Sequence, residues 1–257
     1  MKIVNFNISI KINNANEVAN YLKNQNAEII CLQEVVRPLE DGVVSIFRSE
    51  EVIRKALKKD YPYYFFAPEW VADIHYEPDG KPDRIFGGMA EQGKMILSKY
   101  PITHGYNYFY HKNYEFDRER KDFYLGNDHG RALQVCEINI DGKIIQVGNV
   151  HGVYTSDKKD TEKSLLQSSF IIEKLKEKKI PTILLGDFNL LPSTKSMEII
   201  GKNYKNINEM FKVSSTRPDG KLIDYIFTNK EFLVKSLKAE KTDISDHYPL
   251  IAELELK

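Results

Sequence analysis

The sequence predicts an α/β protein in which two mixed β-sheets pack face to face, with helices on the outside. Two observations predict this class. Short apolar segments typical of strands alternate with segments of helical periodicity, and the strand-like segments come in pairs and hairpins. The chain has 257 residues, and we expect one continuous domain over residues 1–257.

The N-terminal part alternates strand-like and helical segments. The first predicted helix has Val18, Tyr21 and Leu22 three or four positions apart on one face. The strand after it is followed directly by Glu34. In order, we expect a strand at 2–8, a helix at 15–25, a strand at 27–33, a helix at 50–59 and a strand at 63–67.

The middle of the chain has weaker patterns. Residues 68–92 and 99–130 show little periodicity, and a strand-like segment at 93–98 separates them. Loops of that length without structure are unusual, so we expect some local structure and a role in substrate binding. Within the second region, residues 106–116 are rich in aromatics, and we expect a small hairpin that covers an edge of the core.

The C-terminal part contains a clear hairpin and a mixed series of elements. The segments 131–140 and 143–150 flank Asp141-Gly142, a dipeptide that favours a tight hairpin turn because both residues tolerate a positive φ. After the hairpin we expect a helix at 161–178, a strand at 181–189, a helix at 193–200 and strands at 222–228, 232–237 and 249–256.

Composition excludes several classes of protein. Lys plus Arg and Asp plus Glu number 37 each, so no field of the whole protein would hold a polyanion. Cys31 and Cys136 lie in apolar strand-like segments, which excludes a disulfide framework or a cysteine-based metal site. The first residues alternate apolar and polar side chains, which does not fit the apolar stretch of a signal peptide, and no apolar run approaches the roughly 18 residues of a membrane helix. We therefore expect a soluble cytoplasmic monomer without a membrane span.

Polar side chains interrupt or end the buried strands. Taken singly, each has an ordinary explanation, such as a turn former, a solvated carboxylate or a satisfied core histidine. Together they indicate a site, because a buried carboxylate without a partner is costly. These residues are Asn7, Glu34, His151, Asp187, Asn189, Asp224, Asp246 and His247.

The donor atoms of this set favour a hard cation. Carboxylate and amide oxygens with two histidines and no cysteine suit Mg²⁺ or Mn²⁺ better than zinc. Since Mg²⁺ usually takes few protein ligands, the other polar groups stay available for proton transfer and water activation. The residues therefore indicate hydrolysis of a phosphate ester.

The same residues lie in motifs that resemble the endonuclease/exonuclease/phosphatase superfamily. This group includes deoxyribonuclease I, abasic-site endonucleases, neutral sphingomyelinases, inositol polyphosphate 5-phosphatases and tyrosyl-DNA phosphodiesterase 2. The resemblance extends over nearly the whole chain, and GDFN followed by DYIF and SDHYPL is its most specific combination. In order, the motifs are NFNI, CLQEV, GKMILSKYPI, GRALQV, NVHGVY, LLGDFNLLP, LIDYIFT and SDHYPLIAEL.

The resemblance implies a four-layered α/β sandwich like that of deoxyribonuclease I, with a cleft at these strand ends. It implies Glu34 as the principal metal ligand, with Asn7 and Asp246 nearby. Asp187 and Asn189 would position and activate the attacking water.

The resemblance also implies roles for the two histidines. Asp224 and His247 would hold an imidazole against the scissile phosphate. His151 would be a second histidine at the phosphate, paired in the deoxyribonuclease I branch with a glutamate that Glu91 would match. Arg131 opens a strand where family members often place a phosphate-binding arginine, so His151, Asn189 and Arg131 would contact the substrate phosphate.

One position departs from the family pattern. Several members that act on nucleic acids carry a Thr-Trp pair before the late aspartate, and this chain has Thr216-Arg217. Arg217 could contact an anionic substrate, although an arginine in a polar turn is more often solvated.

The leading functional hypothesis is a divalent-metal-dependent phosphodiester hydrolase, most specifically a nuclease. The aromatic residues of 106–124 with Arg118, Arg120 and Lys121 could stack on a single strand and neutralise it. Zero net charge favours instead a phosphatase or phosphodiesterase that acts on a lipid headgroup, a phosphoinositide or a small nucleotide. A third hypothesis, an inactive binding module, predicts missing site residues, and none of the core positions is missing.

Overall fold

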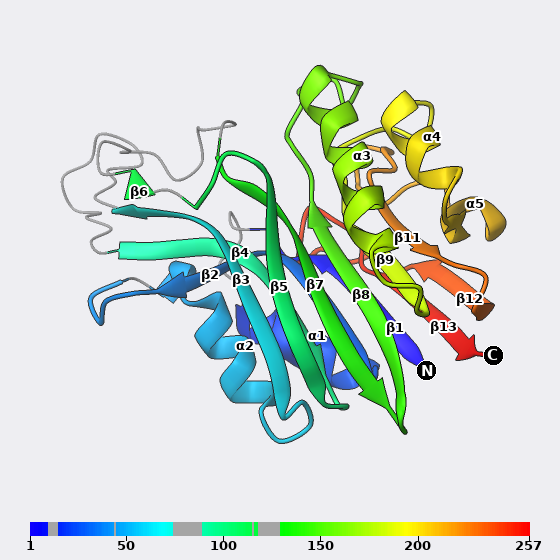
Figure 1. The fold of residues 1–257 in the computed structure, drawn as a ribbon. Helices are drawn as coiled ribbons and strands as arrows, with labels where there is room; N and C mark the ends of the chain where they lie inside the picture. Colours follow the sequence, from blue (N-terminus) through cyan, green and yellow to red (C-terminus); the bar gives the residue numbers. More distant parts are fainter. Residues whose placement is uncertain (10–14, 44, 74–88, 115, 118–128) are drawn as a thin grey trace.

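Two β-sheets form the centre of the computed structural model (Figure 1), which describes residues 1–9, 15–43, 45–73, 89–114, 116–117 and 129–257. The seven-stranded sheet has the order β12 (Phe232–Ala239), β13 (Leu250–Leu256), β1 (Lys2–Asn7), β2 (Ile29–Pro38), β4 (Met89–Ser98), β3 (Tyr63–Asp73) and β6 (Phe116–Asp117). The six-stranded sheet has the order β10 (Lys205–Asn206), β11 (Asp224–Thr228), β9 (Thr182–Asp187), β8 (Lys143–His151), β7 (Arg131–Ile140) and β5 (Ile102–His111).

Helices cover the outer face of each sheet, which gives four layers and confirms the predicted fold class (Figure 1). Helices α1 (Ala15–Gln25) and α2 (Ser49–Leu57) lie against the seven-stranded sheet, and α3 (Glu162–Lys176) and α4 (Lys195–Gly201) lie against the other. The short helices η1 (Ser45–Phe47) and α5 (Ile207–Met210) complete the described elements. Among the described residues, no helix has the length and apolar character needed to cross a membrane.

Strand alternation divides the apolar residues between three clusters. In β1, Ile3 packs in the core between the sheets, while Val4 and Phe6 face α1 and α2. Cys31 and Cys136 are free, buried thiols in the central core, as expected.

Amide side chains connect the two sheets within this core. Gln33 donates to Asn5 Oδ1 at 2.8 Å and to Asn149 Oδ1 at 2.6 Å, and Asn149 donates to Gln134 Oε1 at 2.9 Å. All four side chains are buried. Because orphaned amides are costly in an apolar core, this network favours one relative position of the two sheets.

The parallel strand pairs bring the polar strand ends to the same end of the two sheets. In each sheet one pair is parallel near the centre, β1 with β2 and β8 with β9. His151, the last residue of β8, is the register partner of Asp187, the last residue of β9. Asp224 begins the antiparallel strand β11 opposite Asp187. These three side chains therefore start from adjacent backbone positions.

The structure corrects several strand boundaries. Strand β2 does not end before Glu34 but continues to Pro38. Strand β3 continues to Asp73 and β4 begins at Met89, so the region predicted to be loose at 68–92 contains the ends of two strands. The intervening residues 74–88 lie outside the described part of the chain.

The predicted aromatic hairpin at 106–116 is wrong. Residues up to His111 belong to β5, the edge strand beside β7, whereas β6 pairs with β3 in the other sheet. Lys178 Nζ lies 5.5 Å from the Tyr106 ring centroid, and Lys174 Nζ lies 5.5 Å from that of Tyr108. These rings therefore contact the end of α3, and Arg118, Arg120 and Lys121 lie outside the described residues.

Candidate active site

A histidine–aspartate pair lies at the start of β11 in the six-stranded sheet. His247 Nδ1 is 2.9 Å from Asp224 Oδ2 and 3.1 Å from Oδ1, and both residues are buried. The backbone N–H of His247 donates to Ser245 Oγ at 3.1 Å, and that hydroxyl donates to the Asn7 carbonyl at 2.7 Å. The ring is thus fixed from both sheets, and its Nε2 lies 3.8 Å from Asp187 Oδ2.

The carboxylates around His247 change its protonation. Burial alone lowers its pKa, but Asp224, Asp187 and Asp246 together raise the pKa of His247 from 6.5 to about 9. Arg217 Nη1, 2.7 Å from Nε2, can donate to this nitrogen only when it carries no proton. The contact with Arg217 therefore opposes the carboxylates. We infer that Asp224 keeps a proton on Nδ1 and that Nε2 is the nitrogen that gains or loses one.

Asp187 and Asn189 are held by a tight turn after β9. The Asn189 N–H donates to Asp187 Oδ1 at 2.8 Å, and Asn189 has a positive φ of 58°. Gly186 before them has a φ of 142°, and a Cβ there would lie 2.1 Å from the Val150 carbonyl oxygen. Burial and the neighbouring Asp224 raise the pKa of Asp187, against the attraction of His247 and Lys158. Asp187 is therefore suited to accept a proton.

Glu34 reaches the site because of a β-bulge. Between Leu32 and Val35, β2 has one residue more than β4, and Glu34 has a positive φ of 57°. Bulges re-aim side chains near functional sites. Asn7 Nδ2 donates to Glu34 Oε1 at 3.1 Å and to Asp187 Oδ2 at 3.0 Å, so it joins the two carboxylates.

Asp246 lies beside Arg217 and Ser9. Arg217 Nη1 is 3.2 Å from Asp246 Oδ2, and the Ser9 side chain also hydrogen-bonds to this carboxylate. Burial raises the pKa of Asp246, but His247 and Arg217 lower it more, so Asp246 is ionised near neutral pH. The Ser9 N–H donates to Asn7 Oδ1, which connects Asp246 to Asn7.

The donor set fits a divalent cation. Asp187, Asp224 and His247 place ligand atoms within 4.8 Å of one another. Nδ1 of His247 already bonds to Asp224, so these two groups are less free to hold an ion. Glu34 has a side chain 20% exposed, whereas those of Asp187 and Asp224 are 2% exposed, so Glu34 is the carboxylate best placed for a hydrated ion. Glu34, Asn7 and Asp246 would hold the metal.

His151 forms a second histidine position. Its Nε2 lies 3.8 Å from Glu34 Oε1 and 3.9 Å from Asp187 Oδ2. Burial, together with the nearby Arg131 and Lys94, lowers the pKa of His151 well below its ordinary value. His151 is therefore neutral in this structure.

The expected pairing of His151 with Glu91 is wrong. Glu91 accepts from Arg37 Nε at 2.8 Å and lies on the outer face of β4. Successive side chains of a strand point to opposite faces of the sheet. Ile96, five positions after Glu91 in β4, faces the core between the sheets, so Glu91 faces outward. Glu69 lies beside His151 instead, with Oε2 3.8 Å from Nδ1.

Glu69 is the centre of a buried ionic cluster. Lys94 Nζ lies 2.5 Å from Glu69 Oε1, and neither side chain is exposed. Arg131 Nη1 lies 3.4 Å from Oε2, so the predicted phosphate-binding arginine is adjacent to this cluster. Glu69 is the extra residue of a second bulge, between Pro68 and Trp70, which no sequence pattern indicated.

Two further cations adjoin the site. Lys158 Nζ donates to Asn189 Oδ1 at 2.6 Å, and burial lowers the pKa of Lys158 although Asp187 raises it. Arg217 contacts His247 and Asp246 as described. Both lie in polar loop segments, so sequence periodicity could not place them. For Arg217, the available signal was that Thr216-Arg217 replaces the Thr-Trp pair of the family pattern.

Comparisons with known proteins support the family resemblance. Residues 4–247 match the model of the Endonuclease/Exonuclease/phosphatase family. A protein of this family from Bacteroides vulgatus is similar in structure, with a TM-score of 0.72 and 21% identity over 100% of this chain and 98% of that one.

Two other similar structures carry more specific names. The mannosyl-6-phosphatase of Bacteroides thetaiotaomicron has a TM-score of 0.65 at 16% identity, with both chains fully covered. The human Nocturnin catalytic domain, solved with bound sulfate, has a TM-score of 0.69 at 15% identity over 100% of this chain and 94% of that one. At these identities the likeness concerns the fold. No curated protein matches the sequence significantly.

Proposed function

The chain belongs to the Endonuclease/Exonuclease/phosphatase family, whose members hydrolyse phosphoesters, and we propose that its activity depends on a divalent metal ion, Mg²⁺ or Mn²⁺. The observation that carries this proposal is the His247–Asp224 pair beside Asp187, with Glu34 and Asn7 adjoining. A metal ion bound by Glu34, Asn7 and Asp246 would act as a Lewis acid on the phosphate.

The residues of the chain divide the remaining chemistry. Asp187, whose pKa burial raises, accepts a proton from the attacking water, and Asn189 orients it. His247, whose pKa the neighbouring carboxylates raise, stabilises charge on the phosphoryl oxygens through Nε2 and gives its Nε2 proton to the leaving oxygen, while Asp224 fixes its tautomer. Neutral His151 presents a second imidazole beside Glu34 and Asp187.

For the substrate, the first candidate is a phosphodiester, with nucleic acid as the specific hypothesis. It is supported by the motif combination of the sequence. The aromatic rings on β5 do not add to this support. Tyr108 lies beside Lys174 of α3, and Tyr106 lies beside Lys178, two residues after the helix ends.

The second candidate is a small phosphate ester, including a phosphate monoester. Two cations inside the site favour it, Arg217 beside His247 and Lys158 beside Asn189. The names of two similar structures, a mannosyl-6-phosphatase and a catalytic domain with sulfate, are consistent with small anionic ligands.

A substrate panel tests the proposal. Plasmid, single-stranded DNA, RNA, bis(p-nitrophenyl) phosphate, p-nitrophenyl phosphate, inositol phosphates and sphingomyelin are each assayed with Mg²⁺, Mn²⁺ or EDTA. We expect turnover of at least one phosphoester with metal and none with EDTA. An undiminished rate in EDTA would overturn the metal dependence, and cleavage of plasmid with no small substrate cleaved would select the nuclease.

A further inference from the structure

Arg217 occupies the reactive side of the catalytic imidazole. Its Nη1 lies 2.7 Å from His247 Nε2, the nitrogen opposite the one that Asp224 holds. The same atom is 3.2 Å from Asp246 Oδ2. A phosphate bound at Nε2 of His247 would therefore lie next to this guanidinium.

The loop that carries Arg217 is fixed to the site. Thr216 Oγ1 accepts from the N–H groups of Ile223 and Asp224, both at 3.2 Å, and the Thr216 carbonyl accepts from the Tyr248 N–H at 2.7 Å. Arg217 is thus held between the start of β11 and the residue after His247. A freely solvated turn would not need these contacts.

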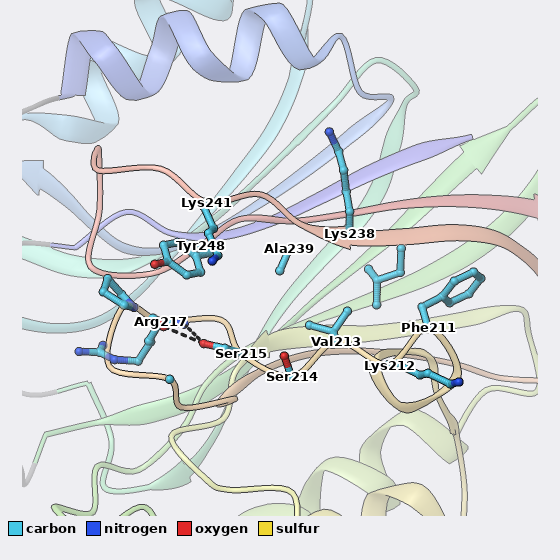
Figure 2. Close-up of a pocket in the computed structure, with 13 residues that line it drawn as sticks. Phe211, Lys212, Val213, Ser214, Ser215, Arg217, Lys238, Ala239, Lys241 and Tyr248 are labelled. Carbon is cyan, nitrogen blue, oxygen red and sulfur yellow. Dashed lines mark hydrogen bonds between the residues drawn. The ribbon is translucent and has the colours of Figure 1, made fainter.

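The guanidinium retains donors and access for a ligand. Arg217 Nε is buried without a hydrogen bond in the described structure, and Asp219 Oδ1 lies 3.5 Å from it. The side chain is 23% exposed, so it is partly accessible to a ligand. Arg217 also lies at one end of a surface pocket of about 440 Å³, next to Tyr248, but the lining of that pocket includes neither His247 nor Asp187 (Figure 2). A planar fork with unused N–H groups matches the oxygens of a phosphate.

Lys158 supplies a second cation on the Asn189 side. Its ammonium bonds to Asn189 Oδ1 and lies 3.9 Å from the Tyr154 ring centroid. Lys158 is buried and has a positive φ of 59°, a strained backbone of the kind found at functional sites. Lys158 and Arg217 are both close enough to Asp187 to interact with its charge.

We propose that Arg217 binds a non-bridging oxygen of the scissile phosphate and thereby selects a terminal phosphate, the phosphate monoester class, over an internal phosphodiester. A diester has two non-bridging oxygens and one negative charge. A monoester has three such oxygens and a charge of about −1.5 to −2 at pH 7. His247 and a metal ion held by Glu34 would engage two of these oxygens, which leaves the third for Arg217. This inference rests on the proposed hydrolytic function and chooses between its two substrate classes.

The test compares wild type, Arg217→Ala and Arg217→Lys on p-nitrophenyl phosphate and bis(p-nitrophenyl) phosphate with Mg²⁺. Arg217→Ala should lower kcat/KM for the monoester by roughly 10²- to 10³-fold, as for removal of one preorganised donor. The loss for the diester should be at least about tenfold smaller, and Arg217→Lys should recover part of the monoester rate because it keeps the charge without the fork. Arg54→Ala, which removes an arginine of α2 that pairs with Glu50, is the matched control and should change neither rate.

Calorimetric titration with inorganic phosphate gives a readout that does not need turnover. Wild type and Arg54→Ala should bind phosphate alike, and Arg217→Ala should bind it at least about tenfold more weakly. Equal losses on the two substrates would mean that Arg217 acts only by positioning His247, and would overturn the inference. If wild type hydrolysed neither substrate with metal, the proposed function would fail. The phosphate titration tests the inference separately, because equal phosphate affinity of wild type and Arg217→Ala would overturn it.

Discussion

Replacing Asp224 by asparagine should remove most of the catalytic benefit of His247. The carboxylate contacts Nδ1 through both oxygens, at 2.9 and 3.1 Å, in a buried position. Without it the imidazole loses both its fixed tautomer and its nearest negative charge. His247→Ala and Asp224→Asn should each lower kcat by roughly 10²- to 10⁴-fold, the usual range for a positioned proton-transfer group.

The same pair predicts how stability depends on pH. In the metal-free protein, the rise of the His247 pKa from 6.5 to about 9 corresponds to about 3 kcal/mol, at about 1.4 kcal/mol for each pKa unit. Because the folded pKa is above the unfolded value, this stability is present below pH 6.5 and is lost as the pH rises towards 9. Asp224→Asn should abolish most of that dependence, since Asp224 is the largest cause that raises the pKa.

Two assays check these expectations. Urea unfolding between pH 5.5 and 9.5 in EDTA gives the stability of wild type and Asp224→Asn, and kcat is measured for wild type, both single variants and the double variant on one substrate. The double variant should be little worse than the worse single variant, because residues that act as a unit are not additive. Multiplicative losses in kcat, or a pH dependence that survives Asp224→Asn, would refute the pairing.

Three further expectations concern stability. Lys94→Met should cost about 3–5 kcal/mol by urea unfolding, because Glu69 then stays buried without its closest cation; a loss below about 1 kcal/mol would show that Arg131 suffices. Asn149→Ala should cost about 1–3 kcal/mol at an unchanged m-value, since Gln33 loses an acceptor between the sheets; an unaltered midpoint would contradict this. Asp160, which accepts from two backbone N–H groups at the start of α4, should stabilise the protein by about 1 kcal/mol. Hydrogen bonds lower its pKa despite burial, so this contribution should disappear as the pH falls through that pKa; a pH-independent effect of Asp160→Asn in thermal melts would contradict it.

Local patterns in the sequence were sufficient for much of the fold. The helix predicted at 15–25 has the observed bounds because its apolar positions follow the helical period. The Asp141-Gly142 turn forms with φ values of 50° and 89°, and β7 pairs with β8 around it as predicted. In both cases the determining interactions are close in sequence.

Bulges and strand alternation explain why the positions of three glutamates could not be predicted from the sequence. Glu34 was expected at a strand end, but one extra residue in β2 turns its side chain into the site within a longer strand. Glu91 was expected beside His151, but strand parity directs it to the outer face, and a bulge in β3 brings Glu69 there. A bulge depends on the neighbouring strand, so a pattern within one strand does not reveal it.

Loop residues were harder still to place. Asp224 and His247 are 23 positions apart and do meet, because each is attached to the end of a buried strand. Lys158 and Arg217 lie in polar loops, where a cation that binds a ligand and a solvated one have the same sequence appearance. Only tertiary contacts distinguish them.

The most direct test of the proposed metal-dependent hydrolysis is the rate as a function of Mg²⁺ concentration for wild type and Glu34→Gln. Protein freed of metal with EDTA should be inactive, and Mg²⁺ should restore wild type along a saturable curve. Glu34→Gln should need at least about tenfold more Mg²⁺, because it loses the anionic oxygen that the ion prefers. Glu137→Gln, a buried glutamate of β7 six residues from Arg131, should follow the wild-type curve. Full activity without metal, or the same Mg²⁺ dependence in Glu34→Gln as in wild type, would contradict the account.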